Sequence, residues 1–258
     1  MHNKLLNNKD RERYARHLSV PEIGEEGQVL LKSASVIIIG MGGLGSASSI
    51  YLAAAGIGRI GIVDFDQIGL SNLQRQILYS TENLGKEKIY FAKTRLESLN
   101  PEITIESYPL KITEDNVEEI IKPYAYVVDA TDNLASRFAL NRACVKLGKP
   151  FIYGAIYQFY GQFTIFNFAD GPCLRCIFRE QGIKQAKESG EPPGIVSAVP
   201  GTIGSLQAVE VIKLILGQGK PAVGRLILYD GLDMKFEEIH LERNPDCPIC
   251  GKEGQKKV

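Results

Sequence analysis

The sequence lacks several features that would assign a function class by bulk chemistry. Its 30 lysines and arginines balance 30 aspartates and glutamates, so overall charge favours neither a nucleic-acid nor a membrane partner. No apolar run free of charge approaches the roughly 20 residues that cross a bilayer. Residues 1–9 lack the apolar stretch of a secretory signal. We therefore expect a cytoplasmic protein that binds no nucleic acid and no membrane.

Histidine is also scarce. His2, His17 and His240 are the only three, and each lies outside every motif in the chain. We assign them no role, and the sequence offers no serine–histidine pair for nucleophilic catalysis. Internal repeats and low-complexity tracts are absent from the sequence as well, so the chain reads as one globular unit.

Cysteine is limited to five residues, but four of them are paired by spacing. Cys173 and Cys176 form one Cys-x-x-Cys unit, and Cys247 and Cys250 form another. Structural disulfides are rare in reducing compartments, so the pairs predict one closed four-thiolate zinc site of structural type. Redox-active pairs are the alternative. Cys144 lies between apolar residues of a predicted helix, which indicates a buried, inert thiol.

The chain does contain a regular alternation of strands and helices. Such an alternation predicts a Rossmann-like, doubly wound, mostly parallel α/β sheet, extended after residue 150 by further, antiparallel strands. The expected strands are 36–39, 59–63, 103–108, 126–128, 151–156, 161–168, 225–229 and 234–241. The expected helices are 10–32, 46–56, 85–99, 114–121, a segment ending near 147, and 203–216, and residues 178–199 are expected to form a mobile loop.

A glycine-rich turn follows the first expected strand. Gly40-x-Gly42-x-x-Gly45 matches the dinucleotide fingerprint: the glycines allow a tight turn, close approach of Gly42 and Gly43 to phosphates, and close helix–strand packing. The helix start also favours an anion. Asp64, 24 positions after Gly40, can accept hydrogen bonds from ribose. A glycine turn that binds no ligand is one alternative. Considered without the rest of the sequence, the turn predicts an NAD-dependent oxidoreductase.

A dense polar block shifts this interpretation towards ATP. In a doubly wound sheet, residues beyond the carboxyl ends of the strands line one crevice, and cations there would neutralise the charge of a reacting triphosphate. Asp132 is a hard oxygen ligand suited to Mg²⁺. Helix caps and solvated surface are the alternative reading of these residues. The candidates are Asp66, Ser71, Asn72, Leu73, Gln74, Arg75, Gln76, Lys88, Asp132 and Asn133.

Taken together, these motifs resemble the ThiF/MoeB/HesA family, relatives of the ubiquitin-activating enzymes, and most closely its MoeB-like members. The resemblance covers about residues 10–251. The motifs that carry it are Gly-x-Gly-Gly-Leu-Gly at 40–45, Asp-Phe-Asp at 64–66, residues 70–76, Thr-Asp-Asn at 131–133, Gly-Ser-Leu-Gln-Ala at 204–208 and both cysteine pairs.

The resemblance implies an adenylyltransferase that uses MgATP to activate the C-terminal glycine of a small ubiquitin-like sulfur carrier ending in Gly-Gly. Gly43 and its neighbours would hold the phosphates, Asp64 the ribose and Asp132 the Mg²⁺. Asn72, Arg75 and Lys88 would contact phosphate. Arg16 would reach the site of a second copy, which implies a homodimer. The chain would divide into a nucleotide-binding half (10–150), a carrier-binding and zinc half (151–251) and a disordered tail (252–258).

One feature departs from part of the family. Some relatives link covalently to the carrier through a cysteine that residues 177–199 lack here. We therefore expect adenylation alone, with sulfur supplied by a separate desulfurase or rhodanese-like protein, and loop 178–199 clamping the carrier tail. A non-catalytic zinc adaptor, or activation of a peptide or a tRNA base, are further alternatives. The sequence leaves open whether the carrier serves molybdopterin, thiamine or another pathway.

Overall fold

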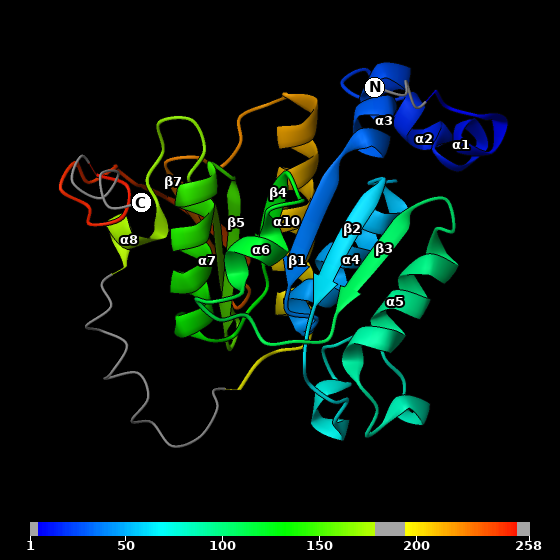
Figure 1. The fold of residues 1–258 in the computed structure, drawn as a ribbon, viewed down its shortest axis with the longest axis horizontal. Coiled ribbons are helices and arrows are strands. Elements are labelled where there is room, and N and C mark those ends of the chain that lie inside the picture. Colours follow the sequence, from blue (N-terminus) through cyan, green and yellow to red (C-terminus); the bar gives the residue numbers. More distant parts are fainter. Residues whose placement is uncertain (1–4, 179–193, 252–258) are drawn as a thin grey trace.

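The computed structural model of the chain describes residues 5–178 and 194–251. Its centre is an eight-stranded sheet in the order β3-β2-β1-β4-β5-β6-β7-β8 (Figure 1). The pairings among β3, β2, β1, β4 and β5 are parallel, and β6, β7 and β8 are added antiparallel. The strands are β1 (Ser35–Ile39), β2 (Arg59–Val63), β3 (Thr104–Tyr108), β4 (Tyr126–Asp129), β5 (Phe151–Tyr157), β6 (Tyr160–Phe166), β7 (Arg225–Asp230) and β8 (Lys235–His240). The predicted fold class is confirmed.

Helices cover both faces of this sheet. α4, α5 and α10 lie on one face, and α6 and α7 lie on the other (Figure 1). The helices are α1 (Asn8–Arg13), α2 (Ala15–Leu18), α3 (Gly24–Ser33), α4 (Gly43–Ala54), α5 (Lys88–Leu99), α6 (Val117–Ile121), α7 (Leu134–Leu147), α8 (Leu174–Ile177) and α10 (Ala198–Leu216), with 3₁₀ turns η1 (Leu70–Asn72) and η2 (Thr81–Asn83).

Successive residues of the central strands feed two separate cores. On β1, Val36 and Ile38 belong to the core beneath α4, α5 and α10, whereas Ile37 and Ile39 belong to the core beneath α6 and α7. All four are almost fully buried. A strand covered on both faces needs apolar residues at every position, which is why this strand could be predicted from a continuous apolar run.

Several helix boundaries differ from the sequence predictions. The expected helix 10–32 is three short helices, because Tyr14 breaks the first and Pro21 lies in a turn before the third. α5 starts at Lys88 rather than at Gly85, whose φ of +75° is left-handed. α4 starts at Gly43 rather than at residue 46, α6 starts later than 114, and α10 starts at Ala198 rather than at residue 203. Strand β6 ends at Phe166, because Asn167 adopts positive φ.

The predicted mobile loop 178–199 is therefore wrong at its end, where α10 has begun. Its remaining stretch at 179–193, like the predicted tail 252–258, lies outside the described residues.

Helix α10 packs across one face of the central sheet. It is the one described helix whose length and composition would allow it to cross a membrane, yet it packs against α4, β5 and β6. A Cβ added at Gly204 would lie 2.5 Å from the carbonyl oxygen of Leu44, so α10 and α4 are in backbone contact there. The helix is thus a core helix of the fold.

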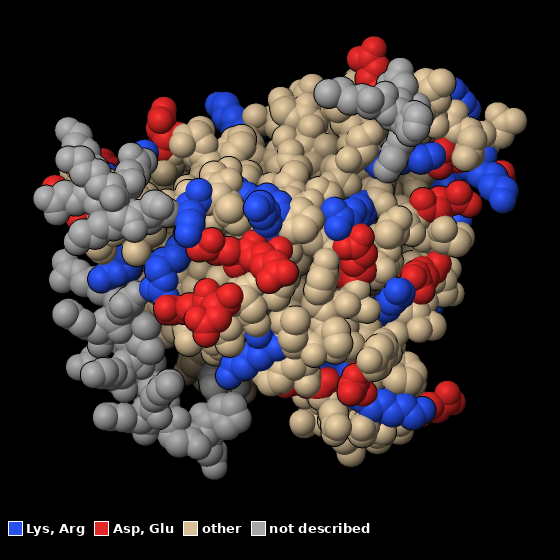
Figure 2. Space-filling view, in the orientation of Figure 1, with Lys and Arg blue, Asp and Glu red and all other residues tan. Residues whose placement is uncertain are grey.

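The outer surface carries mixed charge. Figure 2 shows basic and acidic side chains interspersed over the face that carries α6 and α7. Ion pairs Arg142–Glu114 and Lys146–Glu118 join α7 to the region around α6. Exposed pairs of this kind each contribute little to stability.

A polar cluster lies on β3, the edge strand of the parallel part of the sheet. Both oxygens of Glu106 accept hydrogen bonds from Arg59, at 2.8 Å each. The Tyr124 hydroxyl donates to Glu106 at 2.6 Å and the Tyr108 hydroxyl donates to it at 3.1 Å. The guanidinium of Arg59, followed by these hydroxyls, lowers the pKa of Glu106 to about 2.

We expect Glu106→Gln to lower the free energy of unfolding at neutral pH by roughly 1–2 kcal/mol, a value reduced for solvent screening of a side chain that is about one-third exposed. Because folding lowers this pKa, the stabilisation is present above the unfolded pKa and is lost as pH falls towards about 2. The gap between wild type and variant in urea unfolding should therefore narrow below about pH 5. Glu102→Gln, at an exposed neighbour, is the control, and an unchanged gap would contradict the assignment.

Candidate active site

The glycine turn connects β1 to α4 and lies against the end of β4. Gly40 has a φ of +96°, and a Cβ there would lie 2.6 Å from the carbonyl oxygen of Ala130. A Cβ at Gly45 would lie 1.9 Å from the carbonyl oxygen of Gly40. These two positions therefore require glycine. Gly42 is the N-cap of α4 and provides no side-chain cap, so the first N–H groups of α4 are available to an anion such as phosphate.

Asp64 braces this turn from the end of β2. Its carboxylate is buried and accepts hydrogen bonds from the backbone N–H of Met41 at 2.7 Å and of Asp66 at 2.8 Å. Burial raises its pKa, against the effect of these bonds and of Lys88. Each carboxylate oxygen keeps a lone pair, so the carboxylate can still accept a ribose hydroxyl while it holds the turn.

The polar block 70–76 packs directly beside the glycine turn. A Cβ placed at Gly43 would be 3.5 Å from Cγ of Arg75, and one placed at Gly42 would be 3.7 Å from Nε2 of Gln76. Gln76 is buried, and its Oε1 has no hydrogen-bond partner within the described part of the chain. An unpaired buried amide next to a phosphate-type turn fits a site that gains polar contacts when ligand is bound.

Other members of the block have local structural roles. The Asn72 side chain accepts from the backbone N–H of Gly69 at 3.0 Å, so it closes its own turn. Gln74 donates to the carbonyl of Ile195 at 3.3 Å. Leu73 packs against the core, and Ser71 is exposed. For Asn72, the alternative of a local capping role is therefore the one seen in the structure.

Lys88 opens α5 as a nearly buried cation. Only 4% of the residue is exposed, and its ammonium lies 3.0 Å from Oδ2 of Asp66, whose side chain is half exposed. Asp66 in turn donates its backbone N–H to Asp64. These contacts place Lys88 close to Asp64, the residue that holds the glycine turn. A phosphate could take the place of the exposed partner.

The end of β4 contributes two residues with different roles. Asn133 is the N-cap of α7 and accepts from the Ser136 N–H at 2.9 Å, so the cap alternative holds for this residue. Asp132 is exposed. It follows Thr131, and the preceding Ala130 touches Gly40, so Asp132 adjoins the glycine turn with its carboxylate accessible to a cation.

Arg16 is not brought to this site within one chain. It is exposed on α2, which lies near the amino ends of the parallel strands, whereas the glycine turn lies at their carboxyl ends (Figure 1). Tyr14 anchors that region: its ring fills the space over Gly56, and its hydroxyl accepts from Asn100 at 2.8 Å. Arg16 could therefore act only on a second copy.

The four cysteines come together as predicted. Their sulfurs all lie within 4.8 Å of one another. The Sγ–Sγ distances are 3.9 Å for Cys173–Cys176, 3.7 Å for Cys173–Cys247 and 3.4 Å for Cys176–Cys250. A zinc ion with Zn–S bonds of about 2.3 Å places tetrahedral sulfurs about 3.8 Å apart, so the cluster fits the metal. Asn141 donates towards Cys173 Sγ at 3.8 Å and accepts from the Leu174 N–H. Cys144, outside the cluster, is fully buried, and burial raises its pKa.

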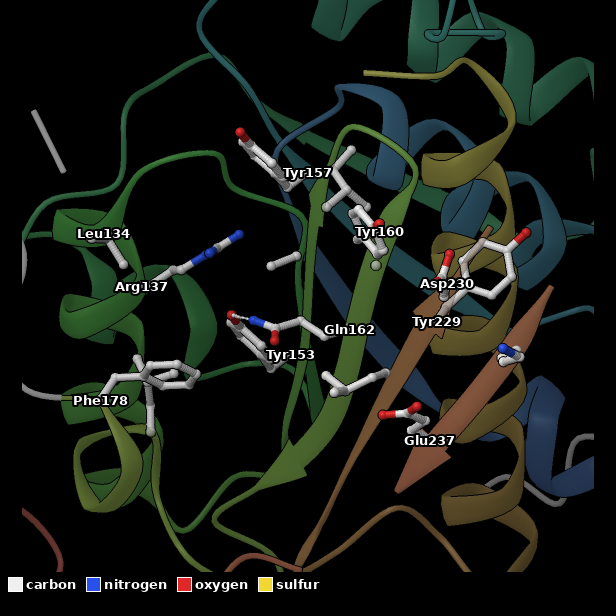
Figure 3. Close-up of a pocket in the computed structure, with 16 residues that line it drawn as sticks. Leu134, Arg137, Tyr153, Tyr157, Tyr160, Gln162, Phe178, Tyr229, Asp230 and Glu237 are labelled. Atoms are coloured by element: carbon white, nitrogen blue, oxygen red, sulfur yellow. Dashed lines mark hydrogen bonds between the residues drawn. The ribbon is translucent and has the colours of Figure 1, made fainter. Parts of the chain in front are cut away.

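A cavity of about 580 Å³ opens on the other half of the sheet. It lies between α7, α8 and the antiparallel strands, and its walls combine aromatic and aliphatic side chains with four charged ones (Figure 3). The labelled wall residues are Leu134, Arg137, Tyr153, Tyr157, Tyr160, Gln162, Phe178, Tyr229, Asp230 and Glu237. Gln162 donates to the Tyr153 hydroxyl at 2.8 Å. Such a concave site, with apolar walls and several polar groups placed among them, suits a bound peptide segment.

Arg137 and Asp129 were missed in the sequence predictions. Asp129 is fully buried at the end of β4, and its Oδ2 lies 3.2 Å from Nε of Arg137. Gln207 is also fully buried and donates to the carbonyls of Asp129 and Ile152. A charged residue closing a buried strand, followed eight positions later by the opposite charge in a helix, was the available signal.

Comparison with known proteins identifies the family of this sequence. The sequence profile of the ThiF family matches residues 14–249. A "Sulfur carrier protein adenylyltransferase" of Thermus thermophilus is 46% identical over 94% of this chain and 91% of its own length. A "SAMP-activating enzyme E1" of Haloferax volcanii is 42% identical over 96% and 91%. An "Adenylyltransferase and sulfurtransferase MOCS3" of Anopheles gambiae is 42% identical over 96% of this chain, which spans 56% of that protein.

Solved structures show the same fold. E. coli MccB in complex with AMPCPP and MccA superposes with a TM-score of 0.84 at 27% identity, covering 97% of this chain and 76% of MccB. The relatives named above are described as adenylyltransferases or as an E1 activating enzyme, not as NAD-dependent oxidoreductases. The chain belongs to the ThiF family.

Proposed function

We propose that this chain uses MgATP to adenylate the C-terminal glycine of a small ubiquitin-like sulfur carrier. The names of the Thermus and Haloferax relatives, aligned over nearly their full length, support this activity. The observation that carries the proposal is the contact chain around the glycine turn. It joins an uncapped helix start to Arg75, to the Lys88–Asp66 pair and to the end of β4 that bears Asp132.

The reaction needs no nucleophilic side chain. A carboxylate oxygen of the carrier's terminal glycine attacks the α-phosphorus of ATP, the bond to the β-phosphate oxygen breaks, and pyrophosphate leaves with that electron pair. Arg75 and Lys88 would stabilise the charge on the phosphoryl oxygens and the leaving group. Asp132 would hold Mg²⁺, which neutralises phosphate charge when bound. Asp64 would hold the ribose. Positioning and electrostatic stabilisation supply the catalysis.

The cavity between α7 and the antiparallel strands is the proposed entry for the carrier tail. Most of its lining residues belong to the half expected to bind the carrier (151–251). Arg137, from the nucleotide-binding half, also lines it and contacts the carbonyl of Thr131, next to Asp132. A tail bound there would lead towards the nucleotide. Arg16 of a second copy would complete the site, giving a homodimer, and the cysteine cluster would hold structural zinc. Sulfur would come from a separate desulfurase or rhodanese-like protein.

An ATP–pyrophosphate exchange assay tests this function. Each ubiquitin-like carrier encoded in the same genome would be supplied full-length and again without its last two residues. We expect exchange with at least one full-length carrier and its loss with the shortened form, because the attacking carboxylate is then out of reach. Exchange that needs no carrier, or that the shortened carrier supports equally, would refute the proposal.

A further inference from the structure

Arg137 lies where the cavity meets the end of β4. It is on the first turn of α7, and 12% of its side chain is exposed. Nη2 donates to the carbonyls of Thr131 at 2.7 Å and of Gly154 at 3.1 Å. Its guanidinium lies 5.1 Å from the Tyr153 ring centroid, and buried Asp129 faces its Nε. One planar group thus connects β4, β5 and the cavity wall.

Nη1 of this guanidinium makes no hydrogen bond with the described residues. Arginine has five N–H donors; Nη2 provides both of its protons to carbonyls, and Nε faces a carboxylate. No hydrogen bond from Nη1 is found in the described part of the protein, and the side chain lines the cavity, pointing into it in Figure 3. The cavity therefore presents two well-oriented N–H donors to its occupant. An extended peptide offers a backbone carbonyl as the matching acceptor.

Resting on the proposed function, we propose that Arg137 is a positioning residue that couples the carrier tail to the nucleotide site. Nη1 donates to a backbone carbonyl of the tail, while Nη2 holds Thr131, the residue before Asp132. Because the guanidinium is planar and rigid, a tail that fixes its plane also fixes the peptide leading into Asp132. Carrier and MgATP should therefore each strengthen the binding of the other, by the same factor.

Calorimetry measures this coupling without turnover. The probe is α,β-methylene-ATP with Mg²⁺, which cannot release pyrophosphate, titrated with and without the carrier that supports exchange. In the wild type the carrier should tighten nucleotide binding by about 5–20-fold. In Arg137→Lys the ratio should fall to near one, because lysine keeps a charge opposite Asp129 but cannot reproduce the planar arrangement in which Nη2 donates to two carbonyls while Nη1 faces the cavity. Arg142→Lys, the same change on the same helix facing Glu114, should keep the wild-type ratio.

A second variant tests the same inference in case Arg137→Lys does not fold. If Arg137→Lys cannot be purified, Arg137→Gln combined with Asp129→Asn removes both charges of the buried pair together, and it must show the same loss of coupling. Coupling that survives in the Arg137 variants, or a wild-type ratio of one despite active exchange, would overturn the inference and leave the proposed function standing. Failure of exchange in the wild type would instead reject the function itself.

Discussion

Replacing Asp132 with alanine is expected to lower ATP–pyrophosphate exchange by about 10²–10³-fold, the usual effect of removing one group that stabilises developing charge. Asp132 is exposed at the carboxyl end of β4, and it is the proposed protein ligand of the magnesium ion. The variant should also need more Mg²⁺ for half-maximal exchange. The measurements are initial exchange rates across a Mg²⁺ titration, with saturating carrier and ATP.

Folding should be unaffected by this change, because surface substitutions without buried partners usually alter stability by about 0.5 kcal/mol or less. The matched control is Asp170→Ala. Asp170 is an exposed aspartate beyond the end of β6. The end of β6 pairs with the start of β5, so Asp170 lies near the amino ends of the parallel strands, away from the glycine turn at their carboxyl ends. It should retain wild-type exchange and Mg²⁺ dependence. If Asp132→Ala retained activity within about threefold, the assignment of Asp132 to the metal would be wrong.

Loss of the four-sulfur site is expected to give the largest change in stability. Cys176→Ser should abolish stoichiometric zinc and lower the melting temperature by roughly 10 °C or more, since losing a structural metal can cost about 4–5 kcal/mol and 1 kcal/mol corresponds to about 2–4 °C at this chain length. Differential scanning calorimetry and elemental analysis of the purified chain measure both effects. The site joins α8, which follows β6, to the segment after β8, so it closes the antiparallel half of the fold.

Cys144→Ala provides the control for cysteine loss. Cys144 is fully buried but has no place in the four-sulfur cluster, so this variant should retain one zinc per chain and lose only about 1 kcal/mol. Zinc content that is unchanged in Cys176→Ser, or zinc that is absent from the wild type, would contradict the metal assignment.

The strands were predictable because each central strand is buried on both faces, as at Val36 to Ile39. The helix starts were not. Gly43 starts α4 where a Cβ would lie 2.9 Å from Cβ of Pro200 on α10, and helix propensity does not reveal such a tertiary contact. Likewise, the two cysteine pairs could be identified by spacing, but only the fold shows that a separation of 74 positions closes to 3.4 Å between Cys176 and Cys250.

The candidate site was predictable where residues follow strand ends, as Asp64 and Asp132 do. The ion pairs in the site could not be predicted. The pairs Lys88–Asp66 and Arg137–Asp129 depend on which elements become neighbours in the sheet. Asn133 shows the opposite case. A local N-cap pattern explains its side chain, although the family motif had suggested contact with nucleotide.

The most direct test of the central claim is intact-mass spectrometry of the carrier after incubation with this protein and MgATP, with hydroxylamine added to a parallel sample. We predict a carrier species that has gained the mass of one adenylyl group, and its conversion by hydroxylamine to a C-terminal hydroxamate. A carrier that stays unmodified under conditions in which the protein binds ATP and the carrier would contradict the account.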